Sequence, residues 1–424
     1  LKNNFEEIDL VIVNFYPFEN ILNNSNNHSK ILENIDIGGP TLVRAAAKNY
    51  NFVTVITKVE QYPKLINELN KNAGGTSLLF RQKMSEEAFT ETAYYDSLIS
   101  NYFNTLTKNK FPKKKLIYGK LLHNLRYGEN PHQHAAIYST KNEIKLKQLN
   151  GKQLSYNNYN DIFSALIISK SLPKNRGTVI VKHTNPCGVS INKDKVESYK
   201  LALKCDPISA FGGIVSCNFK INKKIAIQLN KIFLEVVIGN GIDNDALKIL
   251  KKNKNLRIID SKNIKLEDIQ NIILNFNTLM MQTADNKKFT TNNFKIVSRK
   301  KPSRKTFNNL LFAFNVCRYV KSNAIVLVNN GSTIGIGSGQ PSRLDSCKIA
   351  VNKMKKFQNF EENNEIIAAS DAFFPFVDGI ETLISSGVSA IIQPSGSIRD
   401  KEIIKYADKT GTILIFSKTR HFRH

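Results

Sequence analysis

Short blocks of apolar residues separated by polar stretches predict strands and helices in turn along this chain. Residues 10–14 and 52–57 are brief apolar runs typical of buried strands, whereas residues 40–50 and 85–106 have the longer amphipathic spacing of helices. The β-branched run at residues 178–181 predicts a buried parallel strand. This alternation of strands and helices indicates an α/β fold.

Linker and turn signals divide the pattern into parts. Lysines crowd residues 108–115 around Pro112, which predicts a linker, so we expect one domain at residues 1–112 and another at residues 113–424. Within the second domain, Asn330 and Gly331 separate the apolar runs 324–328 and 333–336. An Asn-Gly pair between two such runs is a strong signal for a β-hairpin.

The β-branched strand described above runs directly into two groups that transfer protons, Lys182 and His183. We expect Asn185, Pro186 and Gly188 to turn the chain there. Both side chains would then lie at the carboxyl end of the strand, where open α/β sheets bind their ligands. For an isolated pair, a histidine satisfied within a turn beside a solvated lysine would be the better interpretation.

The composition narrows the class of protein. A formal net charge of +26 over 424 residues raises the question of nucleic-acid binding, but the lysines are spread along the chain without a repeated basic and aromatic pattern. We therefore interpret most of this charge as solvated surface, part of which can steer anionic substrates. The five cysteines are scattered and no apolar run reaches membrane length, so we expect a cytoplasmic protein without a disulfide framework.

Uncommon strings of residues occur in one order along nearly the whole chain. They are Asn14-Phe15-Tyr16-Pro17-Phe18, Asp36-Ile37-Gly38-Gly39, Arg44-Ala45-Ala46-Ala47-Lys48, Arg126-Tyr127-Gly128-Glu129-Asn130-Pro131-His132-Gln133, Leu154-Ser155-Tyr156-Asn157-Asn158, Lys182-His183-Thr184-Asn185-Pro186, Asp206-Pro207-Ile208-Ser209-Ala210-Phe211-Gly212-Gly213, Ser338-Gly339-Gln340-Pro341-Ser342-Arg343, Ser370-Asp371-Ala372-Phe373-Phe374-Pro375-Phe376, Pro394-Ser395-Gly396-Ser397 and Arg420-His421-Phe422-Arg423-His424. Together they closely resemble the bifunctional purine-biosynthesis enzymes that combine AICAR transformylase with IMP cyclohydrolase.

This resemblance implies a fold and a pair of reactions. The fold is a partial cyclohydrolase domain of the methylglyoxal-synthase-like α/β type, followed by a transformylase domain of two α/β subdomains similar to cytidine deaminase. The reactions are formyl transfer from the cosubstrate 10-formyltetrahydrofolate to the nucleotide AICAR, giving FAICAR, and dehydrative ring closure of FAICAR to IMP. The resemblance also implies a homodimer with no catalytic metal, no membrane and no specific nucleic acid among its partners.

Family members carry a longer amino-terminal segment than this chain, which opens at Leu1. We therefore expect the chain to begin inside the cyclohydrolase domain. Because further residues of the family's ring-closing site lie in that segment, the second reaction is expected to be impaired.

Three residues match the family's transformylase chemistry. The amine of AICAR is a weak nucleophile, so the enzyme must move protons and align two substrates. By resemblance, His183 takes or relays the amine proton, and Lys182 places positive charge beside the developing oxyanion and the departing folate nitrogen. Asn323 supplies an amide that can orient the formyl group, although by itself it would suit a turn or the start of a strand equally well.

Further residues match family positions that bind substrate. Guanidinium groups can grip phosphate oxygens in pairs, and a glycine beside an aromatic ring permits close approach of the backbone to a ligand. Taken singly, each of these matching residues would be better explained as a surface arginine or a core phenylalanine. The matching residues are Arg126, Tyr127, Phe211, Gly212, Arg343, Phe373, Asp378 and Arg420.

For ring closure, Tyr16, Asp36 and Lys48 match active-site positions of the family. Tyr16 and Lys48 can stabilise developing charge on oxygen, and Asp36 can orient the substrate or accept a proton. The glycines that follow Asp36 lead into a helix whose free amides favour an anion. The alternative is a capped helix with a solvated lysine.

Two other classes of function are alternatives. Pro186-Cys187 resembles half of a deaminase zinc motif, but Ser190 stands three residues further on and no His-x-Glu string precedes it. Stoichiometric zinc would support that class. A basic nucleic-acid-binding protein without catalysis rests on charge alone, and steeply salt-dependent RNA binding would support it.

Overall fold

The computed structural model describes residues 6–140, 146–264, 271–359 and 365–424. The chain forms two compact units, the first comprising Leu1–Leu122 with Tyr138–Glu143 and the second comprising His123–Ile137 with Ile144–His424. The boundary predicted at residue 112 falls near this division, and as a boundary between two activities it stays a prediction. A two-stranded sheet of β3 (Lys120–Leu125) and β4 (Ala135–Ser139) lies where the chain passes between the units.

The first unit is a small α/β unit whose two strands are parallel. Apolar residues of its third and fifth helices and of its second strand form the core, among them Val43, Val55 and Met84. The predicted strands and helices are all present, and the long helix begins earlier than expected. The elements are β1 (Leu10–Ile12), α1 (Phe18–Asn24), α2 (His28–Glu33), α3 (Gly38–Lys48), β2 (Thr54–Ile56), α4 (Tyr62–Lys71) and α5 (Leu78–Leu106).

The predicted burial of the first strand was wrong. Leu10 and Ile12 are 36% and 46% exposed, whereas every residue of β2 is buried. Among the described residues β1 pairs with β2 alone, and Val11 is the residue of β1 that packs against the core. One face of β1 is therefore left uncovered.

The second unit is built on one sheet of twelve strands in the order β13-β18-β17-β16-β14-β15-β7-β6-β8-β9-β10-β5. Its strands are β5 (Lys147–Asn150), β6 (Gly177–Lys182), β7 (Asn185–Ile191), β8 (Ile214–Cys217), β9 (Val236–Gly239), β10 (Arg257–Asp260), β13 (Phe294–Ile296), β14 (Ile325–Asn329), β15 (Ser332–Gly337), β16 (Ile366–Ser370), β17 (Val388–Pro394) and β18 (Ile413–Ser417). A separate hairpin is formed by β11 (Asn271–Asn275) and β12 (Thr278–Gln282).

Successive residues of a strand point to opposite faces of a sheet. In this sheet both faces carry apolar residues, and helices cover each of them. In β6, Val179 and Val181 pack with α6 and α11 on one face, and Ile180 packs with the helices of its half on the other. The helices of the unit are α6 (Tyr156–Ser171), α7 (Lys195–Cys205), α8 (Pro207–Ala210), α9 (Lys223–Leu229), α10 (Asn244–Leu250), α11 (Arg304–Cys317), α12 (Arg343–Phe357), α13 (Val377–Ile384) and α14 (Asp400–Thr410).

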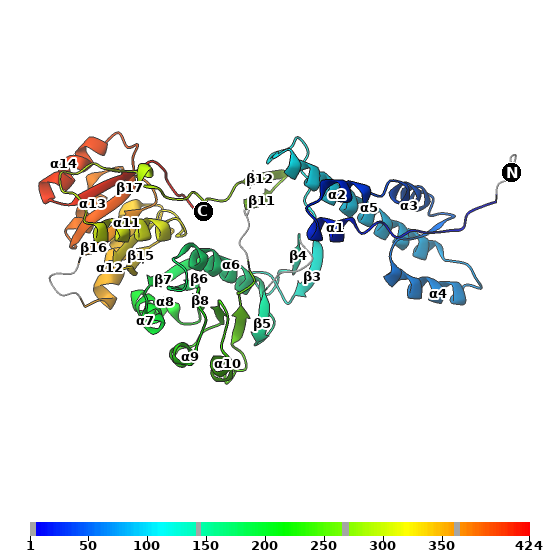
Figure 1. Cartoon of the computed structure of the whole chain (residues 1–424), viewed down its shortest axis with the longest axis horizontal. Helices are drawn as coiled ribbons and strands as arrows, with labels where there is room; N and C mark the ends of the chain where they lie inside the picture. Colours follow the sequence, from blue (N-terminus) through cyan, green and yellow to red (C-terminus); the bar gives the residue numbers. More distant parts are fainter. Residues whose placement is uncertain (1–5, 141–145, 265–270, 360–364) are drawn as a thin grey trace. The chain divides into compact units, whose positions relative to one another are not determined.

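The sheet consists of two halves whose elements follow the same order, apart from the short helix α8 of the first half. By the colours of Figure 1, the second half is drawn in yellow to red. In each half a helix leads into a hairpin, and three helix-strand steps follow, so that β7-β6-β8-β9-β10-β5 corresponds to β15-β14-β16-β17-β18-β13. The halves join where β7 pairs with β15 through Ser190 and Ser332. The expectation of two related α/β subdomains is confirmed.

The structure corrects the predicted surroundings of Lys182. The strand before it is fully buried as expected, but β6 is antiparallel to both β7 and β8 rather than parallel. Two residues, His183 and Thr184, make the turn alone, with φ values of 52° and 62°. The residues expected to form the turn, Asn185, Pro186 and Gly188, lie in β7 instead. A two-residue turn with positive φ matches the twist of an antiparallel pair, so no crossover is needed.

The second hairpin was predicted correctly. Asn330 and Gly331 connect β14 to the antiparallel β15 and have φ values of 44° and 74°. The strand β7 is also antiparallel to β15, so the strand directions of the two halves are linked. As a result, strand ends from both halves meet at one edge of the sheet. They are the carboxyl ends of β6, β15, β16, β17 and β18 and the amino ends of β7, β8 and β14. We call this the shared edge.

Among the described residues, no helix combines the length and apolar character needed to cross a membrane.

Candidate active site

The shared edge collects residues that are far apart in the sequence. Lys182 ends β6, Phe211 precedes β8, Asn323 precedes β14, Phe373 follows β16 and Arg420 follows β18. The start of α12 follows β15 at the same edge. Strand direction alone therefore brings most of the predicted transformylase residues to one side of the second unit.

The turn after β6 presents two proton-transfer groups in different environments. The Lys182 side chain is half-buried, and its Nζ donates a hydrogen bond to the carbonyl oxygen of Phe211 at 2.8 Å. The His183 side chain is exposed at the tip of the hairpin. Asp161 of α6 accepts hydrogen bonds from the backbone N–H groups of His183 at 3.3 Å and Thr184 at 2.6 Å. Lys182 is thus tied to the Phe211 loop, while the imidazole of His183 faces outward.

A hydrogen bond connects this turn to the second half of the sheet. The side-chain oxygen of Asn185 accepts from the backbone N–H of Lys321 at 3.0 Å. Lys321 also accepts from the backbone N–H of Gly339 at 2.8 Å. The segment that carries Asn323 therefore lies beside the turn that carries His183, although the two are far apart in sequence.

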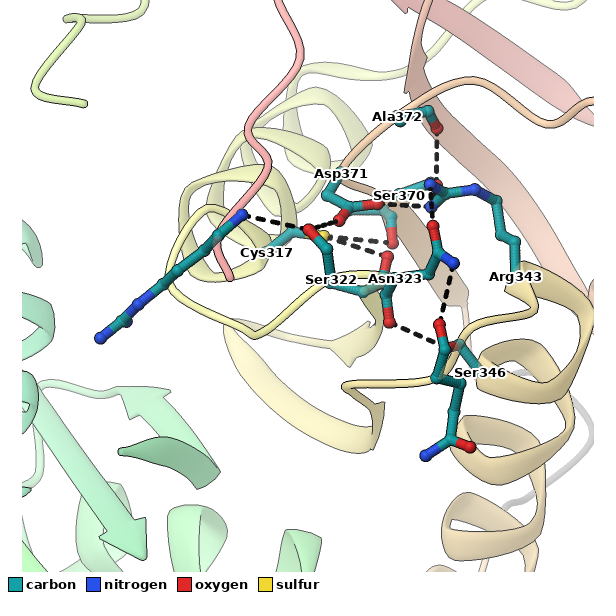
Figure 2. Close-up of polar contacts among 12 residues, drawn as sticks. Cys317, Ser322, Asn323, Arg343, Ser346, Ser370, Asp371 and Ala372 are labelled. Carbon is teal, nitrogen blue, oxygen red and sulfur yellow. Dashed lines mark hydrogen bonds and ion pairs between the residues drawn. The ribbon is translucent and has the colours of Figure 1, made fainter. Parts of the chain in front are cut away.

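Asn323 is held by hydrogen bonds at both ends of its side-chain amide (Figure 2). The amide nitrogen donates to the carbonyl oxygens of Gln340 at 2.8 Å and Pro341 at 2.9 Å, and the amide oxygen accepts from Nη2 of Arg343 at 2.6 Å. Two acceptors on one side and a cationic donor on the other leave a single consistent orientation for the amide. The peptide bond before Asn323 is cis.

Arg343 reaches from the first turn of α12 into this network, as Figure 2 shows. Its side chain is 7% exposed, and its Nη1 bonds to the hydroxyl of Ser370 at 2.7 Å and to the fully buried carboxylate of Asp371. The resemblance predicted that Arg343 is one of the substrate-binding arginines. In this structure its guanidinium bonds to three protein side chains, Ser370, Asp371 and Asn323, and its contact with substrate stays a prediction.

Asp371 links the same network to the end of the chain. Its carboxylate accepts from the Ser322 hydroxyl at 2.6 Å, and its carbonyl oxygen accepts from the backbone N–H of His421 at 2.9 Å. Ser322 in turn exchanges hydrogen bonds with the backbone of Arg423. The segment that carries Arg420 is therefore fastened to the strand start that carries Asn323.

The remaining predicted binding residues are mostly accessible. Arg420 is exposed, with its guanidinium carbon 4.6 Å from the centre of the Phe422 ring. Phe211 and Phe373 are also exposed, and Gly212 has a φ of 73° that suits the close turn beside Phe211. Exposed cationic and aromatic groups at one edge suit an anionic ligand that carries a ring.

Three predicted residues stand apart from these contacts. Arg126 is exposed beside Tyr127, with its guanidinium carbon 5.4 Å from the ring centre. The amide of Asn157, near the start of α6, donates to the carbonyl oxygen of Glu129 at 3.3 Å and so ties this segment to that helix. Asp378 is exposed in the first turn of α13, where its carboxylate accepts from the N–H of Gly379 at 2.7 Å.

The first unit brings two of the three predicted ring-closing residues together. The Asp36 carboxylate accepts from the backbone N–H groups of Gly39 at 2.8 Å and Tyr16 at 3.4 Å. It therefore caps α3, and its oxygen lies where a side chain on Gly39 would clash. Lys48 is exposed at the opposite end of this 11-residue helix, about 16 Å away along the axis. Within one chain, the geometry matches the alternative of a capped helix with a solvated lysine.

The cysteines and the other residues of metal-binding type bear on the zinc alternative. All five cysteines are free and buried, and burial raises the pKa of the Cys187 thiol to about 12. Cys187 lies in β7, inside the sheet. Among the described residues, no three His, Cys, Asp or Glu side chains are grouped so that they could hold a metal ion.

Sequence reasoning missed three residues of this site, Asp161, Ser322 and Asp371. Asp371 stood inside a quoted string and Ser322 directly before Asn323, but nothing local showed that they would face each other. Asp161 lies in α6, 22 residues before the His183 turn that it contacts. An acidic residue on a helix is usually solvated, so no signal short of the folded structure indicated its role.

Comparison with known proteins fits this geometry. The AICARFT/IMPCHase bienzyme family model matches residues 46–353. The chain is 41% identical over 431 residues to the bifunctional purine biosynthesis protein PurH of Ruegeria sp., covering 99% of this chain and 82% of that protein. It is 42% identical over 436 residues to the protein of that name from Persephonella marina, covering 100% of this chain and 83% of the relative. The chain belongs to the AICARFT/IMPCHase bienzyme family.

Proposed function

We propose that formyl transfer from 10-formyltetrahydrofolate to AICAR takes place at the shared edge, with Lys182, His183 and Asn323 as its central residues. As a family member, the chain acts in de novo purine biosynthesis as an AICAR formyltransferase and an IMP cyclohydrolase. The single observation that carries the placement is the hydrogen bond from Lys321 to Asn185, because it sets the His183 turn beside the Asn323 segment.

The proposed roles of Lys182 and His183 follow from their surroundings. When the AICAR amine attacks the formyl carbon, a carbon–nitrogen bond forms, the bond to the folate nitrogen breaks, and one proton leaves the amine. The exposed imidazole of His183 can take that proton and pass it to the departing nitrogen. The Lys182 ammonium has three donors and uses one on Phe211, so the others can face the developing oxyanion.

The proposed role of Asn323 is narrower than the sequence suggested. Both of its amide N–H groups donate to main-chain carbonyls, so they are not free to hold the formyl oxygen. Its amide oxygen accepts from Arg343 and has a second lone pair, which can accept a hydrogen bond from the attacking amine. Arg343 acts through Asn323 in this proposal, by fixing the direction of that oxygen.

Nucleotide binding is proposed for the accessible residues of the set. A guanidinium can hold two phosphate oxygens at once, and Arg420 and Arg126 are the predicted arginines that remain exposed. Phe211 and Phe373 offer apolar ring faces, with Gly212 keeping the backbone beside Phe211 open, and Asp378 can accept hydrogen bonds from sugar or base. Tyr127 is placed next to Arg126 to support its guanidinium.

For ring closure we propose that Asp36 orients the loop that carries Tyr16, since its carboxylate joins the Tyr16 backbone to the start of α3. The Tyr16 hydroxyl, on a side chain that is 54% exposed, can then stabilise charge that develops on the carboxamide oxygen. Lys48 is proposed to bind an anionic part of the substrate from the far end of α3, and Lys48→Ala tests whether ring closure depends on it at all.

A homodimer is proposed as the working form, in a cytoplasmic setting that fits five reduced cysteines. The hairpin of β11 and β12 exposes Ile273, Leu274 and Met280, and Phe276 at its tip is fully exposed. An apolar hairpin of this kind suits burial against a second copy. Phe276→Asp should lower the molar mass measured by light scattering to that of a monomer, and an unchanged dimer would exclude the hairpin from the interface.

The test of the catalytic proposal is an assay with AICAR and 10-formyltetrahydrofolate in which FAICAR and IMP are separated and measured individually. His183→Ala should reduce formyl transfer by roughly 100-fold or more, the usual range for loss of a proton-transfer group. The matched control is His123→Ala, since this exposed histidine lies in β3, which is not a strand of the twelve-stranded sheet. Near-normal turnover of His183→Ala would remove that residue from the proposed mechanism.

A further inference from the structure

The turn that carries His183 has an unusual backbone. Both of its central residues have positive φ, 52° at His183 and 62° at Thr184, and neither is glycine. Positive φ is strained for side chains with a Cβ, and most of all for a β-branched residue such as threonine. The corresponding turn in the second half of the sheet uses Asn330 and Gly331, which adopt this conformation readily. The first turn therefore needs stabilisation that the second does not.

A carboxylate from another element supplies that stabilisation. In a two-residue hairpin the N–H groups of the two central residues lie outside the strand ladder, and successive N–H groups of this kind form a small site for an anion. Oδ2 of Asp161 accepts from the N–H of His183 at 3.3 Å, and Oδ1 accepts from the N–H of Thr184 at 2.6 Å. The carboxylate bridges both groups from α6.

We propose that Asp161 is a positioning residue for formyl transfer, whose carboxylate holds the His183–Thr184 turn in its left-handed form and so directs the His183 imidazole. The proposal rests on the proposed role of His183. It adds a residue from α6 that touches no substrate and acts through the backbone of the turn. The half-buried position of the carboxyl fits this role, because a partner removed from water bonds the two N–H groups more strongly.

The same contact makes the turn sensitive to acid. Burial raises the pKa of the Asp161 carboxyl, and the negative charge of Glu235 acts in the same direction, whereas the N–H groups of the turn and the charge of His183 oppose it. As pH falls through this raised pKa, the carboxyl takes up a proton, and the protonated oxygen becomes a donor that no longer suits the N–H group it faces. Wild-type kcat should then fall at acidic pH through Asp161 in addition to any effect of His183.

The test uses Asp161→Asn, which keeps size and shape but turns an NH₂ group toward one of the two N–H donors. We expect kcat to fall by about 10-fold to 100-fold, the range for a misplaced catalytic group, with KM for AICAR and for the folate little changed. Thr184→Gly should recover part of kcat in the Asp161→Asn background, because glycine adopts the turn conformation without strain. The matched control is Asp194→Asn, since Asp194 also accepts from two backbone N–H groups but caps α7.

Measurement of all variants in the His183→Ala background separates the possible failures. If Asp161 acts through His183, Asp161→Asn should cause no further loss once His183 is alanine. An equal loss in both backgrounds, or wild-type kcat in Asp161→Asn, would overturn the inference while leaving the role of His183 intact. Near-normal turnover of His183→Ala would instead overturn the proposed function. If Asp161→Asn does not fold, as judged by circular dichroism, the Asp161→Asn/Thr184→Gly variant takes its place in the same comparison.

Discussion

Replacement of Arg343 by methionine should destabilise the fold, because it removes the cation at the centre of the network in Figure 2. Methionine matches the length of the arginine stem but removes the charge and the donors to Ser370, Asp371 and Asn323. Asp371 is fully buried, and among the described residues its carboxylate would keep one side-chain donor, the hydroxyl of Ser322. The perturbation thus leaves a buried charge without its cationic partner.

The magnitude follows from that loss. Removal of one member of a buried ion pair costs about 3–5 kcal/mol, and we expect the lower end because Ser322 remains as a donor. Arg343→Met/Asp371→Asn should be more stable than Arg343→Met alone, because the second change removes the unpaired charge. Urea unfolding followed by far-ultraviolet circular dichroism gives the comparison, with tyrosine fluorescence as a second probe since the chain has 14 Tyr and no Trp.

Arg343→Lys separates stability from catalysis. Lysine keeps a positive charge for Asp371 but lacks the planar fork that serves Asp371 and Asn323 at once. We expect it to retain most of the stability that Arg343→Met loses, while formyl transfer stays low because the Asn323 amide is no longer held. A loss of less than about 1 kcal/mol in Arg343→Met, or normal kcat in Arg343→Lys, would refute this account of the network.

Two further predictions concern a binding residue and a contact between the halves. Arg420→Ala should weaken AICAR binding by about 1.5–3 kcal/mol and leave folate binding nearly unchanged, as measured by calorimetry with each ligand; equal losses for both would contradict a contact with the nucleotide phosphate. Lys353→Met should lower the free energy of unfolding by about 1–3 kcal/mol near neutral pH, because Lys353 of α12 pairs with the buried Asp206 at 2.8 Å. Burial favours a higher pKa for Asp206, but hydrogen bonds from Lys353 and Ser209 outweigh it and lower the pKa below the usual 3.8. A carboxyl with a lowered pKa stabilises the fold above its unfolded value and loses that contribution as pH falls through the folded value, so the difference between wild type and Lys353→Met should shrink below about pH 4. A difference that stays constant from pH 7 to pH 3 would contradict this assignment.

Local chemistry was enough to predict much of the secondary structure. Asn330-Gly331 predicted a hairpin correctly because the two residues that connect its strands have the φ preferences the turn requires. The helix near residue 40 and the long helix ending at Leu106 were also predicted from their spacing; the first begins and ends two residues earlier than predicted, and the second begins seven residues earlier. These features depend on residues that are neighbours in sequence, so the sequence carries their signal directly.

The direction of β6 was not predictable in this way. A continuous β-branched run shows that a strand is buried on both faces, but it does not show which strands lie beside it. In this fold a two-residue turn sends the chain straight back, and β8 pairs on the other side, so a strand expected to be parallel is antiparallel to both neighbours. The pairing is decided by contacts between segments that are far apart.

The candidate site likewise has residues that the sequence indicated and partners that only the tertiary structure revealed. Family motifs named Lys182, His183 and Asn323 from the sequence, because their residue types and order are specific. The partners that hold them are Asp161, Arg343 with Asp371, and the carbonyl of Phe211, and each reaches its target from another element. A hydrogen bond between distant segments exists only after the sheet has brought strand ends to a common edge. Residue types therefore indicated the chemistry. The orientation of each side chain was decided only by the tertiary structure, because it depends on hydrogen-bond partners that are far away in the sequence.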